Sequence, residues 1–199
     1  AGTQAAEAGF DEIQFDYIRF ATDSTMRQVV FDEEETKGRS KTDIIAEFTQ
    51  YAYDSLTPLG VFVSADVFGA IIGSEEDAGA VGQIYGEMAQ SLDYICPMIY
   101  PSHYGDGNFG LDHPDLHPYE TILGALQKSE EELSAYPEEE RQAVVRPWLQ
   151  DFTATYLKHH IKYGNDEIRE QIQAVYDAGY EEWILWNASN NYHYGGLEQ

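Results

Sequence analysis

The sequence predicts an α/β protein that forms an incomplete (β/α)8 TIM barrel, namely its last five βα units (strands 4–8). Five short runs are rich in β-branched and aromatic residues, and helical patterns separate them. The 199 residues fall short of the about 250 of a typical full barrel. The alternative is a complete open five-stranded sheet of flavodoxin type. No glycine-rich phosphate loop follows any predicted strand, which favours the barrel.

The five predicted strands share a high content of Val, Ile, Phe, Tyr and Trp, which favours extended structure. Because helices separate them, they are expected to pair in parallel, with right-handed crossovers. We expect one partial barrel domain over residues 1–199. The predicted strands are residues 11–20, 60–69, 93–101, 143–152 and 181–189.

The helices are predicted from apolar spacing and from their end residues. Ser40 and Asp43 form a capping-box pair at the start of one helix. Pro118 suits the first turn of another, and Gly179 suits the end of the last. Residues 8–13 (AGFDEI) and 178–183 (AGYEEW) repeat the same order of helix end, glycine and strand. The predicted helices are residues 1–8, a segment after Ser40, residues 76–92, a segment after Pro118 and residues 166–178.

The charge narrows the class of partner. The chain has 36 acidic and 11 basic residues, a formal net charge of −25. Nucleic acid and anionic membranes would repel it, so we expect neither as a partner and expect a neutral or cationic ligand. Cys96 is the single cysteine, so we expect no internal disulfide and no cysteine-based metal site.

The chain also lacks common targeting and cofactor patterns. No stretch approaches the roughly 20 apolar residues of a membrane span, so no membrane insertion is expected. We expect no cofactor and no metal. The first residues lack an initiator methionine, a basic region and an apolar segment, which suggests a mature or truncated piece of a longer protein. The acidity suits an extracellular or cell-surface location.

Two aspartates near predicted strand ends are the candidate catalytic residues. In the first strand Gln14 and Asp16 share one face, and in the second Ser64 and Asp66 share one face. Neighbouring parallel strands lie about 4.8 Å apart. Two carboxylates at matching heights would then be about 5 Å apart, the spacing in retaining glycosidases. The alternative is that Asp16 pairs with Arg19 and only holds a loop.

Other predicted strand ends carry residue types that bind sugars. Aromatic rings can stack on sugar rings, and amide or charged groups can bind hydroxyls. The alternative is that these aromatic rings fill the core. The predicted substrate-binding residues are Gln14, Arg19, Tyr100, Trp148, Gln150, Trp186, Asn187 and Asn190, and Asp151 is a third catalytic candidate.

Five blocks together resemble a bacterial family described as a putative glycosyl hydrolase domain. The match runs across nearly the whole chain, in strand order. The resemblance implies a TIM-barrel glycoside hydrolase fold whose upstream strands are absent here. One departure is Ala21, where the family pattern has proline. The blocks are residues 10–20 (FDEIQFDYIRF), 63–69 (VSADVFG), 93–104 (DYICPMIYPSHY), 146–152 (RPWLQDF) and 186–192 (WNASNNY).

Residues 10–16 also look like the fourth-strand motif of chitinases, but Ile18 stands where chitinases have their acid. The layout is more similar to that of α-amylases. By that resemblance Asp16 is the nucleophile, Asp66 the acid/base and Asp151 a stabiliser. Gln14 stands where amylases have an arginine.

The resulting hypothesis is a glycoside hydrolase that cleaves an extracellular or cell-wall polysaccharide through paired carboxylates. A non-catalytic glycan-binding or cell-envelope module on the same scaffold is the alternative. A third possibility is that the isolated piece is inactive, because missing strands supply part of the site. An open barrel edge would favour self-association.

Overall fold

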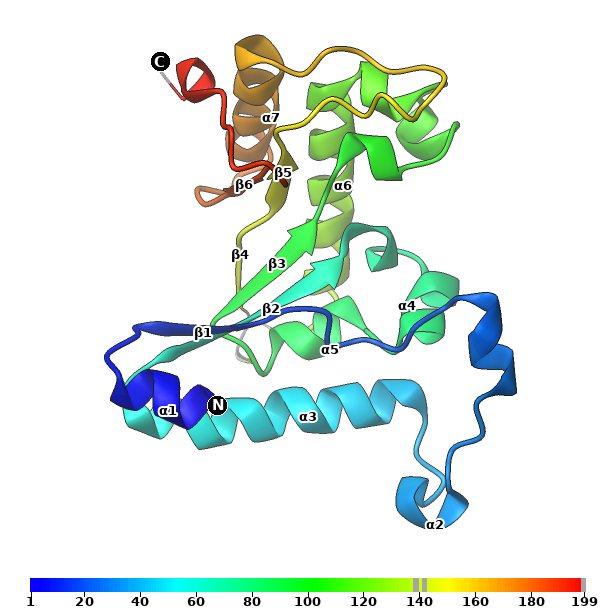
Figure 1. Cartoon of the computed structure of the whole chain (residues 1–199), viewed down its shortest axis with the longest axis vertical. Coiled ribbons are helices and arrows are strands. Elements are labelled where there is room, and N and C mark those ends of the chain that lie inside the picture. Colours follow the sequence, from blue (N-terminus) through cyan, green and yellow to red (C-terminus); the bar gives the residue numbers. More distant parts are fainter. Residues whose placement is uncertain (138–139, 141–142, 198–199) are drawn as a thin grey trace. The chain divides into compact units, whose positions relative to one another are not determined.

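The computed structural model describes residues 1–137, 140 and 143–197 and shows an α/β fold (Figure 1). The strands follow the order β1-β2-β3-β5-β6, with β4 beside β3. The pairs β1–β2, β3–β5 and β5–β6 are parallel, as the sequence predicted. The strands are β1 (Glu12–Phe15), β2 (Phe62–Phe68), β3 (Tyr94–Met98), β4 (Val144–Val145), β5 (Trp148–Gln150) and β6 (Ile184–Trp186).

All five predicted strand regions contain strand, but each strand is shorter than predicted. The fourth region is two strands, since β4 ends at Val145 and β5 begins at Trp148. Pro147 lies in the interruption, and proline has no N–H to donate to a neighbouring strand. Its carbonyl still accepts the N–H of Ile184 at 2.9 Å. Assignment of these strands as numbers 4–8 of a barrel stays a prediction.

The chain divides into two compact units, which we describe separately. Unit 1 comprises residues 1–67, 71–95 and 132–144, and unit 2 comprises residues 68–70, 96–131 and 145–199. The α-helices are α1 (Gly2–Glu7), α2 (Glu33–Thr36), α3 (Lys41–Leu56), α4 (Glu75–Val81), α5 (Tyr85–Ala89), α6 (Pro118–Leu133) and α7 (Asn165–Asp177).

Short 3-10 helices connect these elements. They are η1 (Ser24–Gln28), η2 (Thr57–Leu59), η3 (Gly69–Ile71), η4 (Pro101–His103), η5 (Asn108–Gly110), η6 (Pro114–Leu116) and η7 (Tyr194–Gly196).

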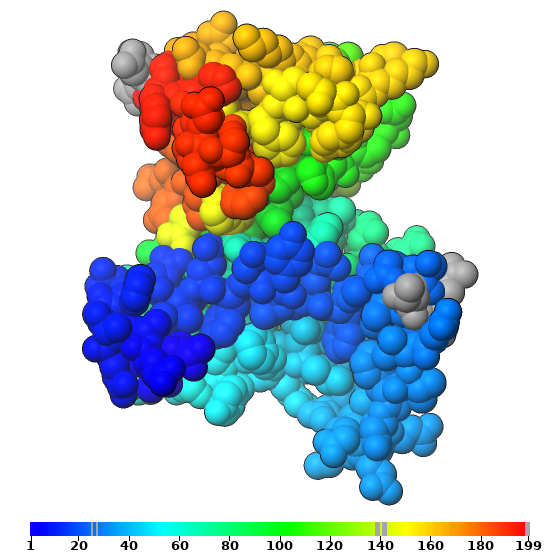
Figure 2. Space-filling model, viewed as in Figure 1, coloured from blue at the N-terminus to red at the C-terminus, as the bar shows by residue number. Residues whose placement is uncertain are grey.

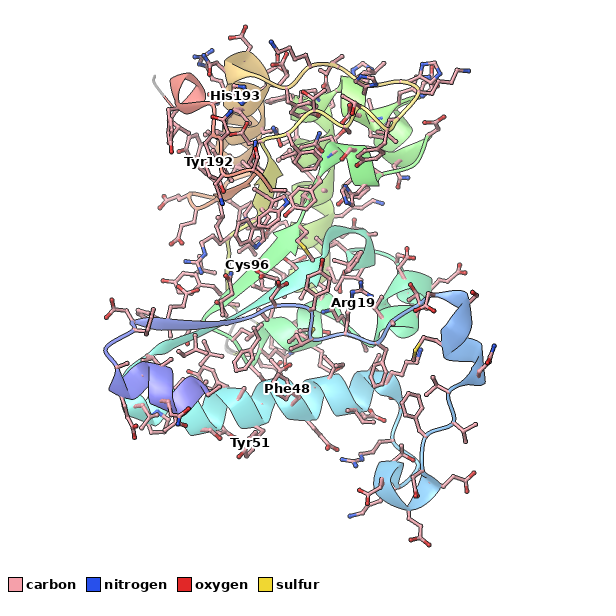
Figure 3. The ribbon with its side chains drawn as sticks, in the orientation of Figure 1. Arg19, Phe48, Tyr51, Cys96, Tyr192 and His193 are labelled. Carbon is pink, nitrogen blue, oxygen red and sulfur yellow. The ribbon has the colours of Figure 1, made fainter. Side chains whose placement is uncertain are left out.

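In unit 1, α3 covers the apolar side of β1. The predicted capping box is present, because Ser40 Oγ accepts the N–H of Asp43 and the Asp43 carboxylate accepts the N–H of Ser40. The Phe48 ring packs edge-on against Phe15 of β1 at 5.2 Å between centroids, and Figure 3 shows Phe48 directed toward the strands. Tyr51, on the opposite side of α3, is 72% exposed. Phe15 of β1 thus faces a helix.

The prediction of one helix over residues 76–92 is wrong. Two helices occupy this region, and α4 ends at Gly82, whose φ is +83°. This left-handed conformation ends a helix and is one that glycine adopts at little cost. Apolar spacing continued across Gly82 and did not show the break.

The two glycine joints are confirmed as structural repeats. Gly9 follows α1 with φ +94°, and Gly179 follows α7 with φ +87°. In each case the next N–H reaches back into the helix, from Phe10 to the carbonyl of Ala5 and from Tyr180 to that of Val175. Left-handed glycines with such bonds end helices and redirect the chain into the next strand.

Candidate active site

The register of β1 and β2 in unit 1 bears on the hypothesis that Asp16 and Asp66 act as a pair. Gln14 pairs with Ser64 and Phe15 with Ala65 in the parallel ladder. Asp16 and Asp66 are each the next residue after that last pair. Matching heights are the geometric condition on which the paired-carboxylate hypothesis depends.

The polar faces of β1 and β2 are joined by side-chain hydrogen bonds. Gln14 Nε2 donates to Asp66 Oδ1 at 2.9 Å, and Ser64 Oγ donates to Glu12 Oε1 at 2.6 Å. Asp66 is 6% exposed, and Asp16 is exposed. The structure therefore brings Gln14 and Asp66 together, with the Asp66 side chain held by an amide.

The alternative Asp16–Arg19 pair is not found within the part of the chain that the structure describes. The guanidinium of Arg19 lies 5.4 Å from the centre of the Tyr17 ring, and its Nη1 donates to the carbonyl of Phe20 at 3.3 Å. Tyr17 has φ +55°, a left-handed conformation that turns the chain directly after Asp16. Arg19 thus stabilises the turn after β1.

In unit 2, Gln150 lies at the end of β5 and is completely buried. Its Nε2 donates to Asp115 Oδ1 at 3.0 Å and to the carbonyl of Phe152 at 3.1 Å, while its Oε1 accepts the N–H of Ser102 at 3.0 Å. The Gln150 amide, predicted to bind sugar, thus makes its hydrogen bonds within the protein. It joins the segments after β3 and β5.

Burial is the main cause of the pKa shifts of two groups around this amide. Burial raises the pKa of Asp115, and the hydrogen bonds from Gln150 and from the N–H of Ile161 oppose that rise. Burial lowers the pKa of His103, and the charge of Asp115 opposes that change. Both groups are therefore shifted toward their neutral forms.

A pocket of about 520 Å³ in unit 2 is lined by none of the predicted site residues. The His113 and His159 rings stack there at 3.9 Å between centroids, and His113 Nδ1 lies 3.0 Å from Asp106 Oδ1. In the described residues no group of three His, Cys, Asp or Glu side chains could hold a metal ion. The pocket is lined by Ser102, His103, Tyr104, Gly105, Asp106, His113, Pro114, Asp115, Leu157, Lys158 and His159.

Asp151, the third predicted catalytic residue, is also completely buried. Its Oδ1 lies 2.5 Å from His193 Nδ1, and its Oδ2 accepts the backbone N–H of His193 at 2.9 Å. Figure 2 shows the C-terminal segment (red) against the segment that follows β5 (yellow). The carboxylate is therefore covered by His193, and the imidazole is the exposed member of the pair.

The predicted aromatic residues differ in accessibility. Tyr100 is 7% exposed and packs against His103 and Phe152, as the core alternative describes. Trp148 and Trp186 meet edge-on at 6.0 Å between centroids, and Trp186 is 43% exposed. Of these three rings, Trp186 is the one with a large surface open to a ligand.

The two predicted asparagines build the turn after β6. Asn187 is buried and donates to the carbonyls of Asp151 and Asn191, and its Oδ1 accepts from Ser189. Asn190 is exposed and has φ +55°, a conformation that asparagine tolerates better than most residues. Asn187 is thus satisfied within the protein, and Asn190 shapes the turn.

Sequence reasoning missed His193. A lone histidine between Tyr192 and Tyr194 fits no metal or triad spacing, so it carries little information by itself. The clue that was present is its position a few residues beyond a predicted strand end, where ligand sites of such folds lie.

Comparison with solved structures shows the fold of glycoside hydrolases. The spore cortex-lytic enzyme SleL of Bacillus cereus matches with a TM-score of 0.59 and 12% identity over 98% of this chain and 50% of its own. The PgaB (BpsB) glycoside hydrolase domain of Bordetella bronchiseptica matches with a TM-score of 0.56 and 12% identity over 94% of this chain and 54% of its own.

A third structural match is catalytic domain 2 of the Group II chitinase of Ostrinia furnacalis. Its TM-score is 0.53 at 11% identity, over 94% of this chain and 63% of its own. The chain therefore spans about half to two thirds of these proteins. No curated protein sequence matches it.

Two further observations bear on the class of protein. In the described residues no helix is long and apolar enough to cross a membrane. Residues 2–192 match the family described as "Putative glycosyl hydrolase domain". The match covers nearly all of the chain and agrees with the fold of the structural matches, and so this chain belongs to that family.

Proposed function

We propose that this domain hydrolyses glycosidic bonds of a polysaccharide, with Asp16 and Asp66 as the catalytic carboxylates. The observation that carries the proposal is the β1–β2 register, in which Asp16 and Asp66 are the residues that directly follow the last ladder pair, Phe15 with Ala65. Family membership supports the reaction class.

In this proposal Asp16 attacks the anomeric carbon while Asp66 donates a proton to the departing oxygen. The glycosidic bond breaks, and a covalent glycosyl–Asp16 ester forms. Asp66 then takes a proton from water, which cleaves the ester and restores both carboxyl groups. The exposed position of Asp16 suits the nucleophile, and the Gln14 amide would hold Asp66 in orientation.

The substrate class follows from charge and from the family. A net charge of −25 disfavours polyanionic glycans, so neutral or amino polysaccharides are the proposed substrates. Substrates of this kind in cell walls or outside the cell would place the protein there. Among the proposed sugar-contacting residues, Gln14 and Arg19 of unit 1 are not buried. In unit 2 the same holds for Trp148, Trp186 and Asn190.

A non-catalytic glycan-binding module is the second candidate. The observation that favours it is the Trp186 ring, which is 43% exposed beside Trp148. Binding would then depend on Trp186 and not on Asp16. The two candidates therefore predict different sensitive residues.

Reducing-sugar release from a panel of neutral and amino polysaccharides tests the proposal. Replacement Asp16→Asn or Asp66→Asn should lower the rate at least 100-fold, because each removes a group that takes part in bond cleavage. The control is Asp54→Asn, which makes the same charge change at an exposed position of α3 and should keep the wild-type rate.

Equal release by the wild type and Asp16→Asn would reject Asp16 as nucleophile. No release by the wild type from any polysaccharide would contradict hydrolysis by this chain. Glycan binding that survives Asp16→Asn but is lost in Trp186→Ala would then identify the binding module.

A further inference from the structure

Asp151 and His193 form a carboxylate–histidine pair in which the carboxylate is buried and the histidine is partly exposed to solvent. The Asp151 side chain has no exposed surface, whereas 38% of the His193 side chain is exposed. The two Asp151 oxygens accept from the backbone N–H and the ring Nδ1 of the same residue. Both the backbone and the ring of His193 are thus held by one buried group.

The hydrogen bond to Asp151 determines what the rest of the ring can do. The ring uses Nδ1 in its contact with Asp151, so Nε2 is the nitrogen left for a hydrogen bond with a ligand. A sugar hydroxyl can both donate and accept, so it can pair with Nε2 in either protonation state of the ring. His193 therefore offers a second nitrogen on a ring that Asp151 orients.

The segment that carries His193 is held at several points. Arg169 Nη2 of α7 donates to the carbonyl of Gly195 at 2.9 Å, and the Asn187 amide donates to the carbonyl of Asn191 at 3.0 Å. A Cβ on Gly196 would lie only 2.7 Å from the Ile168 side chain, so this segment packs closely on α7. A ring held in this way loses little conformational freedom when a ligand binds.

Aromatic residues flank His193 in the sequence. Tyr192 and Tyr194 flank His193, with their ring centres 6.4 Å apart, and Tyr194 is 69% exposed. Figure 3 shows Tyr192 and His193 on the same C-terminal segment. Exposed aromatic rings next to a few oriented polar atoms are typical of carbohydrate sites.

We infer that His193 is a glycan-contacting residue, with its Nε2 in a hydrogen bond with a sugar hydroxyl, and that Asp151 is its positioning residue. The chemical class of the ligand rests on the proposed function. The backbone N–H of His193 already anchors the loop to Asp151, so a purely structural role would not require 38% of the His193 side chain to stay exposed.

Two replacements of His193 separate contact from loop anchoring. His193→Asn keeps an N–H near the position of Nδ1 but removes Nε2. His193→Gln keeps a polar group near Nε2 and loses the donor to Asp151. The control is His160→Asn, at an exposed histidine whose Nδ1 lies 2.7 Å from the carbonyl of Leu157.

The measurement is ¹⁵N NMR of the histidine rings in the wild type, titrated with hexasaccharides of N-acetylglucosamine, glucosamine and glucose. We expect Nδ1 of His193 to be protonated and its Nε2 resonance to move with at least one sugar. His193→Asn should bind that sugar about tenfold more weakly, and His160→Asn should bind it as the wild type does.

Three results would overturn the inference: a proton on Nε2 instead of Nδ1, no response of His193 to any hexasaccharide, or wild-type affinity in His193→Asn. The wild-type titration still tests the inference if a variant fails to fold. A His193 response without sugar release would support the inference and reject hydrolysis. Sugar release without a His193 response would reject the inference alone.

Discussion

Acidic side chains at strand ends, and one in the 3-10 helix η6, have different surroundings in the two units. In unit 1, Asp16 is exposed and Asp66 accepts from the Gln14 amide. In unit 2, Asp115 and Asp151 are buried, and both carboxylates accept several hydrogen bonds from the protein. A buried carboxylate with protein partners stabilises the loops around it, whereas an exposed carboxylate is open to a substrate. Asp115 and Asp151 thus stabilise unit 2, and Asp16 of unit 1 is the carboxylate that is exposed.

The comparison predicts that the largest loss of stability comes from replacing Gln150. Gln150→Ala should lower the free energy of unfolding by about 3 kcal/mol, because it leaves Asp115 and the N–H of Ser102 buried without this partner. Urea unfolding measures the change. The control is Gln173→Ala on exposed α7 surface, which should change stability by less than about 0.5 kcal/mol. Similar losses in both variants would contradict the role of the buried amide.

Two glycines in the two units should respond to alanine with opposite signs. A Cβ on Gly69 would lie 2.5 Å from the carbonyl oxygen of Met98, so Gly69→Ala should destabilise by about 2 kcal/mol. Gly79, inside α4, has nothing within 4 Å of that position. Gly79→Ala should therefore stabilise by about 0.5–1 kcal/mol through helix propensity. Thermal unfolding of both variants checks the signs, and a stabilised Gly69→Ala would show that the β2 end is looser than described.

The smallest predicted effect is a contrast in pH dependence. Burial raises the pKa of Asp115, so its contribution to stability is full below pH 3.8 and is lost as pH rises through the folded-state value. The hydrogen bonds from Ser40 lower the pKa of Asp43, so its contribution is present above pH 3.8 and is lost as pH falls.

Urea unfolding over about pH 2–7 tests this contrast. As pH rises, the free energy of unfolding of the wild type should fall relative to that of Asp115→Asn. Relative to that of Asp43→Asn, it should rise. If both free-energy differences changed with pH in the same direction, the opposite pKa shifts of Asp115 and Asp43 would be contradicted.

Local features that depend on neighbouring residues could be predicted from the sequence. The capping box at Ser40, the glycine joints at Gly9 and Gly179, and the five strand regions in order are all confirmed. Each of these arises from backbone preferences or alternation over a few residues. The break at Gly82 and the interruption at Pro147 were missed, because apolar spacing continues across both.

The sequence by itself determined the α/β class, the family and the candidate carboxylates at the ends of β1 and β2. The tertiary structure decided which polar groups are exposed to solvent. It buried Gln150 against Asp115 and Asp151 against His193, residues 35 and 42 positions apart in the chain. Hydrogen-bond partners so distant in sequence leave no periodic pattern, since they are selected by which strand ends and loops meet in space. The inner and outer members of the Asp151–His193 pair could therefore be told apart only in the folded chain.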